Sequence, residues 1–232
     1  MLAIPLILLA LLMWSVLRKV PGVEGDEAGA KRYFSSIIGL LKNKVMLILV
    51  VSNGLRAMGT VSVFAFFSLY CSKDLGFSSA KVGFYYMLMM ASGIASQPFL
   101  GYLSDRFGRR VVIIPSMMLL GLFQILIVWS GSGAGLVLAA LCTGLFIYSV
   151  SILAQAAAMD ATPPGAGGAT IALLMGSAAL FQIPSPTIAG ALSESYGTPS
   201  VFLYSGALVL ASSLVLLFLP KDSLKVSSEK GG

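Results

Sequence analysis

The chain has 232 residues, of which 57 % are hydrophobic and only 10 % are charged, and its net charge is +6. Soluble globular domains average roughly a quarter charged residues, so this composition excludes a soluble protein. Apolar runs of about 20 residues, the length that crosses a bilayer as a helix, recur along the chain and predict an all-α polytopic membrane protein with about seven transmembrane helices. The positive charge indicates basic cytoplasmic loops and contact with membrane lipid, and we expect no nucleic-acid partner.

The first apolar run covers residues 2–17, and basic residues follow it rather than precede it. A cleavable signal peptide has the opposite order, so residues 1–19 are predicted to span the membrane with the N-terminus outside. A first residue at the edge of a helix also suggests a truncated chain. Residues 20–44 are predicted to be a cytoplasmic linker, whose second half is either an amphipathic helix on the inner membrane surface or a solvated connector.

Residues 45–219 are predicted to form a six-helix bundle, and residues 220–232 a cytoplasmic tail. The predicted spans are 45–70, 81–102, 111–129, 135–158, 169–192 and 201–219. Twelve of the 15 Lys and Arg residues then fall on one side of the membrane, two fall on the other side, and Arg56 lies inside a span. Basic residues are enriched in cytoplasmic loops, so the prediction is N-out and C-in, in a plasma or inner membrane.

A compact polar stretch, Gly-Tyr-Leu-Ser-Asp-Arg-Phe-Gly-Arg-Arg at residues 101–110, lies between two long apolar runs. Each charge would cost about 2.5–3.5 kcal/mol in lipid, so the stretch is predicted to be a turn on a water-facing surface. Gly101 and Gly108 allow close helix approach and a tight reversal, and Asp105 can cap a helix N-terminus. Arg106, Arg109 and Arg110 can pair with carboxylates or lipid phosphates.

A second stretch, Gly-Ala-Leu-Ser-Glu-Ser-Tyr-Gly at residues 190–197, repeats the pattern Gly-x-Leu-Ser-acid-x-aromatic-Gly of residues 101–108. Each copy closes the middle helix of a predicted three-helix group, one copy on the inner side and the other on the outer side. Two groups of opposite orientation are typical of transporters built from inverted repeats.

The stretch Gly-x-Leu-Ser-Asp-Arg-x-Gly-Arg-Arg resembles the signature loop of the major facilitator superfamily, a family of twelve-helix secondary transporters. The order of one helix, a basic linker and six helices is similar to the C-terminal half of such a protein, preceded by the last helix of its N-terminal half. The resemblance implies secondary active transport of a small organic solute by alternating access, such as proton-coupled efflux or organic-anion transport. It also implies a missing N-terminal half as partner.

In similar transporters, an acid of this loop, the arginine four residues on and an acid that ends a later helix form a charge network. This network closes the inner side of the outward-open state. The resemblance assigns that role to Asp105, Arg109 and Asp160, although Asp160 could instead cap the following helix.

Arg56 is the main clue to a substrate site. It lies about 18 Å along a helix from Lys44, near the membrane midplane, where a cation must face a cavity or a charged partner. No acid of this chain lies at that depth, so the partner is an anionic substrate, an acid of the missing half, or backbone carbonyls and water. Asn53, one turn away, is expected to share the cavity.

Gln155 and Gln182 are further cavity candidates, with hydrogen bonding between helices as the alternative. Gln182 is favoured because Pro184 and Pro186 are predicted to break the helix just beyond it and to free backbone carbonyls.

A seven-span receptor or a membrane scaffold would have the same topology and remains the alternative function. An enzyme is not favoured, because the chain has no His and no span combines a nucleophile with a base. We therefore predict no catalytic residue, no metal and no cofactor.

Overall fold

The computed structural model describes residues 27–220, with side chains from residue 35 onward. The chain divides into two compact units, residues 1–36 and 37–232. Helix α2 (Glu27–Lys42) occupies the second half of the predicted linker. The predicted first span, residues 1–19, and nearly all of the predicted tail lie outside the described residues.

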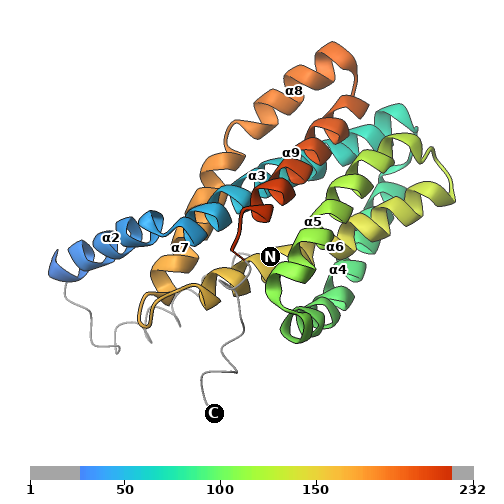
Figure 1. The fold of residues 1–232 in the computed structure, drawn as a ribbon. Helices are drawn as coiled ribbons and strands as arrows, with labels where there is room; N and C mark the ends of the chain where they lie inside the picture. The colour runs from blue at the N-terminus through green and yellow to red at the C-terminus, as the bar shows by residue number, and fades with distance from the viewer. Residues whose placement is uncertain (1–26, 221–232) are drawn as a thin grey trace, which may run out of the picture. The chain divides into compact units, whose positions relative to one another are not determined.

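Every regular element of the second unit's described part is helical (Figure 1). The elements after α2 are α3 (Lys44–Leu69), η1 (Tyr70–Asp74), α4 (Ser79–Phe107), α5 (Arg109–Leu126), η2 (Ile127–Trp129), α6 (Ala134–Asp160), α7 (Gly167–Gln182), α8 (Ser185–Tyr196) and α9 (Pro199–Leu217). Each of the six spans predicted in residues 45–219 falls on one of these helices or on a consecutive pair. The predicted all-α fold is confirmed for the described residues.

Five stretches of the described residues are long and apolar enough to cross a membrane: α3 with η1, α5 with η2, α6, α7 with α8, and α9. Helix α4, with 29 residues, also has the length to cross. It does not reach the apolarity of the other five, because its middle carries polar residues such as Ser92, Ser96 and Gln97.

The break between α7 and α8 lies where the sequence predicts it. Helix α7 ends at Gln182, and α8 begins at Ser185 with a proline in its first turn. A proline lacks the backbone N–H that a continuous helix needs, so Pro184 and Pro186 interrupt the hydrogen-bond ladder.

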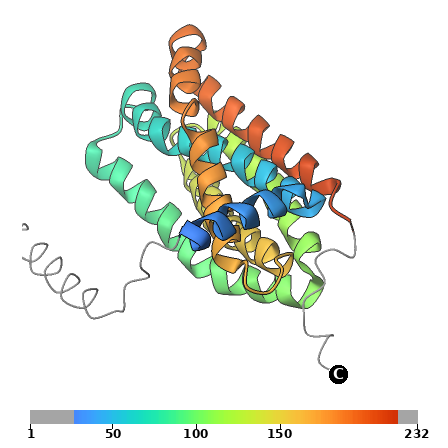
Figure 2. The ribbon, with the colours of Figure 1, turned by 90° about the vertical axis from the view of Figure 1, so that its left-hand side faces the viewer.

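The helices of the second unit pack side by side as a bundle (Figures 1 and 2), and the pairs in contact have an internal twofold pattern. Helix α4 packs mainly on α6, and α7 packs mainly on α3. Helix α3 also packs on α9, α6 on α5, and α5 and α9 on each other. Exchanging α3, α4 and α5 for α6, α7–α8 and α9 leaves this set of contacts unchanged, as expected for two inverted three-helix repeats.

Glycines let the helices of these pairs approach closely. A Cβ atom on Gly93 of α4 would lie 2.9 Å from the carbonyl oxygen of Gly144 on α6. A Cβ atom on Gly206 of α9 would lie 2.7 Å from the carbonyl oxygen of Gly121 on α5. With side chains this small, helix backbones pack tightly in a membrane, where no hydrophobic force drives helix association.

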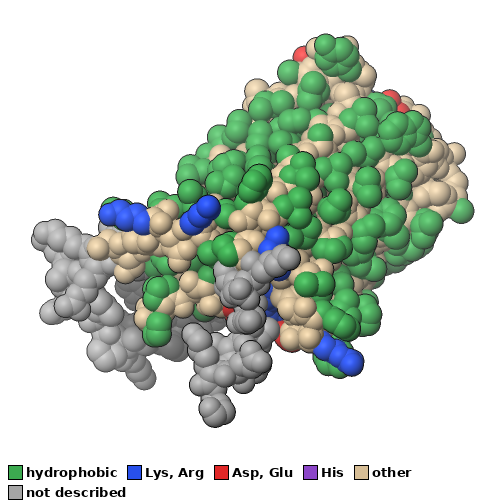
Figure 3. All heavy atoms as spheres, in the orientation of Figure 1, with side chains coloured by type: hydrophobic (Ala, Val, Ile, Leu, Met, Phe, Trp, Pro, Cys, Tyr) green, Lys and Arg blue, Asp and Glu red, His purple; other side chains and the backbone are tan. Residues whose placement is uncertain are grey.

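Buried apolar side chains form two clusters, with a polar level between them. One cluster lies near the start of α3 and includes Met46 and Leu49. The other lies near the end of α3 and includes Val63 and Phe67. On the face seen in Figure 3, hydrophobic side chains cover most of the bundle between its ends, as a lipid-facing surface requires. Arg56 belongs to the stretch of α3 between the two clusters.

Candidate functional site

A cavity of about 280 Å³ lies between α3, α6 and α7. All four predicted cavity residues line it: Asn53 and Arg56 from α3, Gln155 from α6, and Gln182 from α7. Ser151 of α6 adds a hydroxyl, and Leu174, Met175, Ala178 and Ala179 of α7 supply the apolar part of the wall. The sequence analysis missed Ser151, although it lies four residues before Gln155 and therefore on the same helix face.

Arg56 is held at the cavity by a short chain of hydrogen bonds. Only 7 % of its surface is exposed. Its Nη2 donates to Oδ1 of Asn53 at 2.9 Å, and Nδ2 of Asn53 donates to the carbonyl oxygen of Leu174 on α7 at 3.1 Å. The Nε atom of Arg56 has no hydrogen-bond partner. Among the described residues, both ion pairs belong to Arg109, so no carboxylate neutralises Arg56 there.

The local sequence of α3 explains how Asn53 reaches α7. Gly54 faces the ring of Phe181, and a Cβ atom at position 54 would lie 2.7 Å from that ring. The missing side chain lets α3 and α7 approach, and Asn53 and Arg56, three residues apart, share a helix face.

Two other polar residues of the spans do not belong to the cavity. Gln124 is buried, and its Oε1 accepts a hydrogen bond from Ser205 of α9 at 2.9 Å. It therefore joins two helices. Gln97 is half-buried on α4 and does not line the cavity.

The predicted loop at residues 101–110 is shorter than the sequence suggests. Helix α4 continues to Phe107 and α5 begins at Arg109, so the turn itself is Gly108, with φ +95°. The prediction of a tight reversal holds at Gly108. The expected close helix approach at Gly101 is wrong, because a Cβ atom there would meet nothing within 4 Å.

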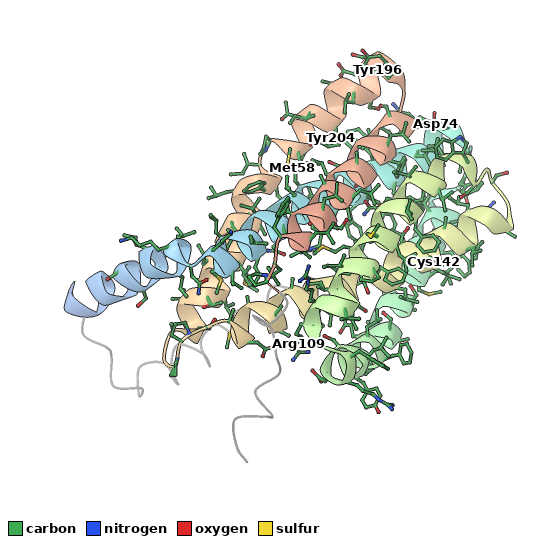
Figure 4. All side chains as sticks on the ribbon, in the orientation of Figure 1. Met58, Asp74, Arg109, Cys142, Tyr196 and Tyr204 are labelled. Carbon is green, nitrogen blue, oxygen red and sulfur yellow. The ribbon has the colours of Figure 1, made fainter. Side chains whose placement is uncertain are left out.

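Arg109 connects the ends of three helices. It forms an ion pair with Asp105 in the last turn of α4, and its Nε donates to Oδ2 of Asp160, the last residue of α6, at 2.8 Å. Its Nη1 also donates to Oγ of Ser104 at 3.3 Å. We call Asp105, Arg109 and Asp160 the inner cluster, after the side of the membrane on which the sequence analysis predicts them. The structure brings these three residues together, and Figure 4 shows Arg109 at the end of the bundle opposite Asp74 and Tyr196.

The capping roles considered for the two acids are not observed. Asp105 lies at the C-terminal end of α4, and no side chain caps the start of α5. Helix α7 likewise begins without a side-chain cap, so Asp160 does not cap it. Both carboxylates bind the Arg109 guanidinium instead, because a charged donor makes a stronger hydrogen bond than a backbone amide.

The other two arginines have different surroundings. Nη2 of Arg110 donates to the carbonyl oxygen of Leu217 at the end of α9, at 2.9 Å. Arg106 is exposed, and its guanidinium lies 5.6 Å from the centroid of the Phe107 ring.

The second copy of the motif reproduces the geometry of the first and keeps its acid, as Glu194, but has no arginine. Gly108 and Gly197 have φ of +95° and +84°, and their N–H groups donate to the carbonyl oxygens of Ser104 and Ser193, each at 3.0 Å. Left-handed backbone conformations of this kind favour glycine. The two motif glycines therefore terminate the middle helices of the two repeats in the same way.

Comparison with known proteins finds one matching family model and several relatives of similar identity. The family model of the Major Facilitator Superfamily matches residues 49–232. Solute carrier family 22 member 17 of Mus musculus is 27 % identical over 182 residues, which cover 76 % of this chain and 45 % of that protein. An MFS-type transporter of Aspergillus fumigatus is 26 % identical over 196 residues, covering 84 % of this chain and 45 % of the relative. The uncharacterized MFS-type transporter YcaD of Salmonella newport is 28 % identical over 193 residues, covering 80 % and 48 %.

The chain spans about half the length of these curated relatives. The family match covers α4 to α9 completely and α3 from its second turn onward. It agrees with the resemblance of residues 101–110 to the family's signature loop and with the twofold packing of α3 to α9. The chain is an integral multi-pass membrane protein and belongs to the major facilitator superfamily.

Proposed function

We propose that the chain is part of a secondary active transporter that moves a small organic solute across a membrane by alternating access. The observation that carries this proposal is a polar cavity with a buried cation, in a bundle whose buried side chains are mostly apolar. The cavity is lined by α3 of the first repeat and by α6 and α7 of the second. Polar groups inside a membrane protein are costly and usually mark a transport path. In transporters of inverted repeats, substrate sites lie at the interface between the repeats, near the midplane.

The inner cluster is proposed to hold the transporter closed on its inner side. Ion pairs that are partly exposed contribute only about 0–1 kcal/mol each. The side chains of Asp105 and Asp160 are 57 % and 22 % exposed. Contacts of this strength can stabilise one conformation and still break during each transport cycle.

The proposed orientation places the inner cluster and residues 220–232 in the cytoplasm. Arg106, Arg109 and Arg110 lie at one end of the bundle, and Lys73 and Lys81 lie near the other. A basic end of this kind is typically cytoplasmic. In the proposed domain plan, residues 1–19 form the last helix of the N-terminal half, residues 20–44 the linker, and residues 45–219 the C-terminal bundle, which contacts membrane lipid.

A proton-coupling carboxylate is proposed to come from the N-terminal half of the transporter. The acids in residues 37–220 are Asp74, Asp105, Asp160 and Glu194, and each lies at or near a helix end. A carboxylate that carries a proton with the solute would need to lie within the membrane.

Flux through proteoliposomes tests the proposal. The chain is reconstituted together with its N-terminal half, and saturable uptake of radiolabelled benzoate, tetraethylammonium and glucose is measured, to cover negative, positive and neutral solutes. Saturable uptake of at least one probe is expected. If correctly inserted protein carries none of the three, the proposed transport function is wrong, and the receptor or scaffold alternative gains support.

A variant of Asp105 tests the proposed closing role of the inner cluster. Asp105→Asn removes one charge from the cluster and should leave membrane insertion intact. It destabilises the closed conformation by up to about 1 kcal/mol and should lower flux by up to about fivefold. Asp74→Asn, an exposed acid at the opposite end, is the matched control and should keep normal flux. Equal flux in the two variants would rule out a closing role for the inner cluster.

A further inference from the structure

We infer that the Arg56 cavity binds the carboxylate of a singly charged organic acid, with Arg56 as its anchor and the apolar wall of α7 against its hydrocarbon part. A monocarboxylate would be the substrate class of the transport site proposed above, so this inference rests on that proposed function. Binding itself can be measured without transport.

The charge of Arg56 is the first reason. A cation that is more than nine-tenths buried is strongly disfavoured unless an opposite charge compensates it. Residues 37–220 supply no such charge, because Arg56 has no ion pair and the acids of this part of the chain lie at or near helix ends. An anion that entered the cavity would therefore gain the attraction of an uncompensated charge.

The geometry of the guanidinium is the second reason. The Asn53 amide uses its Nδ2 on Leu174 of α7 and its Oδ1 on Nη2 of Arg56, so both ends of the amide are fixed. Asn53 thereby orients Arg56 without neutralising it. Nε is buried and has no partner. Asn53 uses one of the five N–H groups of the guanidinium, and a guanidinium held in this way can donate two parallel N–H groups to a planar carboxylate.

The rest of the lining limits the ligand to one negative charge and a modest size. Arg56 is the only cation of the cavity, whose other polar groups are the neutral side chains of Asn53, Ser151, Gln155 and Gln182. These amides and the hydroxyl can solvate a second polar group, and Leu174 and Met175 can contact a hydrocarbon body. The volume of about 280 Å³ is near the lower end of small-molecule sites, which range over about 300–1,000 Å³.

Benzoate and benzamide provide a matched pair of probes, because they have nearly the same shape and differ in charge. The dissociation constant of each is obtained from the dependence of the melting temperature of the purified 232-residue chain on probe concentration. Benzoate is expected to bind at least about tenfold more tightly than benzamide, since a charge-assisted bidentate contact is lost with the amide. Equal binding of the two probes, or no binding of benzoate, would overturn the assignment.

Two variants test whether Arg56 is the anchor. Arg56→Gln removes the cation and should abolish the preference for benzoate. Asn53→Asp places a carboxylate on the guanidinium itself. The variant loses the N–H that donates to the carbonyl oxygen of Leu174 and gains an ion pair with Arg56, so it should melt near the wild-type temperature without probe, yet lose benzoate binding. Because Asn53→Asp is expected to fold, its loss of binding cannot be attributed to unfolding. Benzoate affinity at the wild-type level in either variant would contradict the inference.

Thr60→Val is the matched control. Thr60 lies on α3 one turn beyond Arg56, its buried hydroxyl has no hydrogen-bond partner, and it does not line the cavity. This variant should bind benzoate like the wild type. Loss of binding here would show that any change in α3 disturbs binding, which would overturn the specific role of Arg56.

The two proposals can fail separately. If benzoate binds through Arg56 but no probe is transported, the transport function is wrong and the anion site stands. If glucose or tetraethylammonium is transported with saturation while benzoate does not bind, the protein is a transporter and the anion site is wrong.

Discussion

At the residue scale, the space around a helical glycine differs from one helix to another. Gly144 of α6 faces Met89 and Ser92 of α4, and its neighbours leave no room for a side chain. Gly101, in the last part of α4, has open space around it. Both glycines are helical, so the difference lies entirely in what each one faces.

Substitution of these two glycines by alanine is expected to shift stability in opposite directions. Gly144→Ala forces α4 and α6 apart, at a cost of about 1–3 kcal/mol. Gly101→Ala adds helix propensity without a contact and should stabilise by about 0.5–1 kcal/mol. The melting temperatures of the two purified variants in detergent measure the difference. A Gly144→Ala protein as stable as the wild type would mean that α4 and α6 do not pack backbone to backbone at this position.

Arg56 and its neighbours could be predicted from sequence because polar residues are conspicuous in an apolar segment. Hydropathy identifies Asn53, Gln155 and Gln182 for the same reason, and all of them line one cavity. It does not separate them from Gln124, which joins α5 and α9. Hydropathy reports that a group needs a polar partner, and only the packing of the helices determines whether that partner is a neighbouring helix or a cavity.

At the element scale, the ends of helices were harder to predict than their existence. The predicted polar loop at 101–110 is mostly helix, because hydropathy reports the surrounding medium and not the backbone conformation. Helix α4 can carry Asp105 and Arg106 in its last turns once those turns have left the lipid. Proline acts on the backbone directly, so the break after Gln182 was predicted at its observed position.

Because of that break, α8 is joined to α3 by hydrogen bonds of its own, separate from those of α7. Oγ of Ser185, the first residue of α8, donates to the carbonyl oxygen of Met58 and pairs with Oγ of Ser62, each at 2.6 Å. Helix α7 is attached separately, through the contact of Asn53 with Leu174. The two halves of the span are therefore joined to α3 by different groups.

Ser185→Ala is expected to loosen α8 while leaving α7 unchanged. Loss of the buried hydrogen bonds costs about 0.5–1.5 kcal/mol each. Hydrogen exchange measured by mass spectrometry should become faster for the amides of α8 and stay at the wild-type rate for those of α7. Ser195→Ala, an exposed serine of the same helix, is the control. Equal acceleration in α7 and α8 would mean that the span moves as one unit despite the break.

At the scale of the whole molecule, the motif repeated at 101–108 and 190–197 predicts two units of opposite orientation. It does not predict which helices touch. That α4 packs on α6 and α7 on α3 follows from glycines and hydroxyls whose partners lie far away in the sequence. Such pairings depend on the complementary shapes of two helix surfaces, and the sequence of one helix does not reveal which other helix it fits.

The opposite orientation of the two repeats makes a prediction about sidedness. In a background with Cys71→Ala and Cys142→Ala, single cysteines are placed at Pro164, between α6 and α7, and at Ser195, near the end of α8; both positions are exposed. A membrane-impermeant maleimide should label Ser195→Cys on intact cells and Pro164→Cys only after permeabilisation, because the basic end of the bundle is proposed to be cytoplasmic. The reverse pattern would keep the fold and reject the orientation. Labelling of both positions from the same side would instead mean that α7 and α8 do not cross the membrane together, which would contradict the inverted repeat itself.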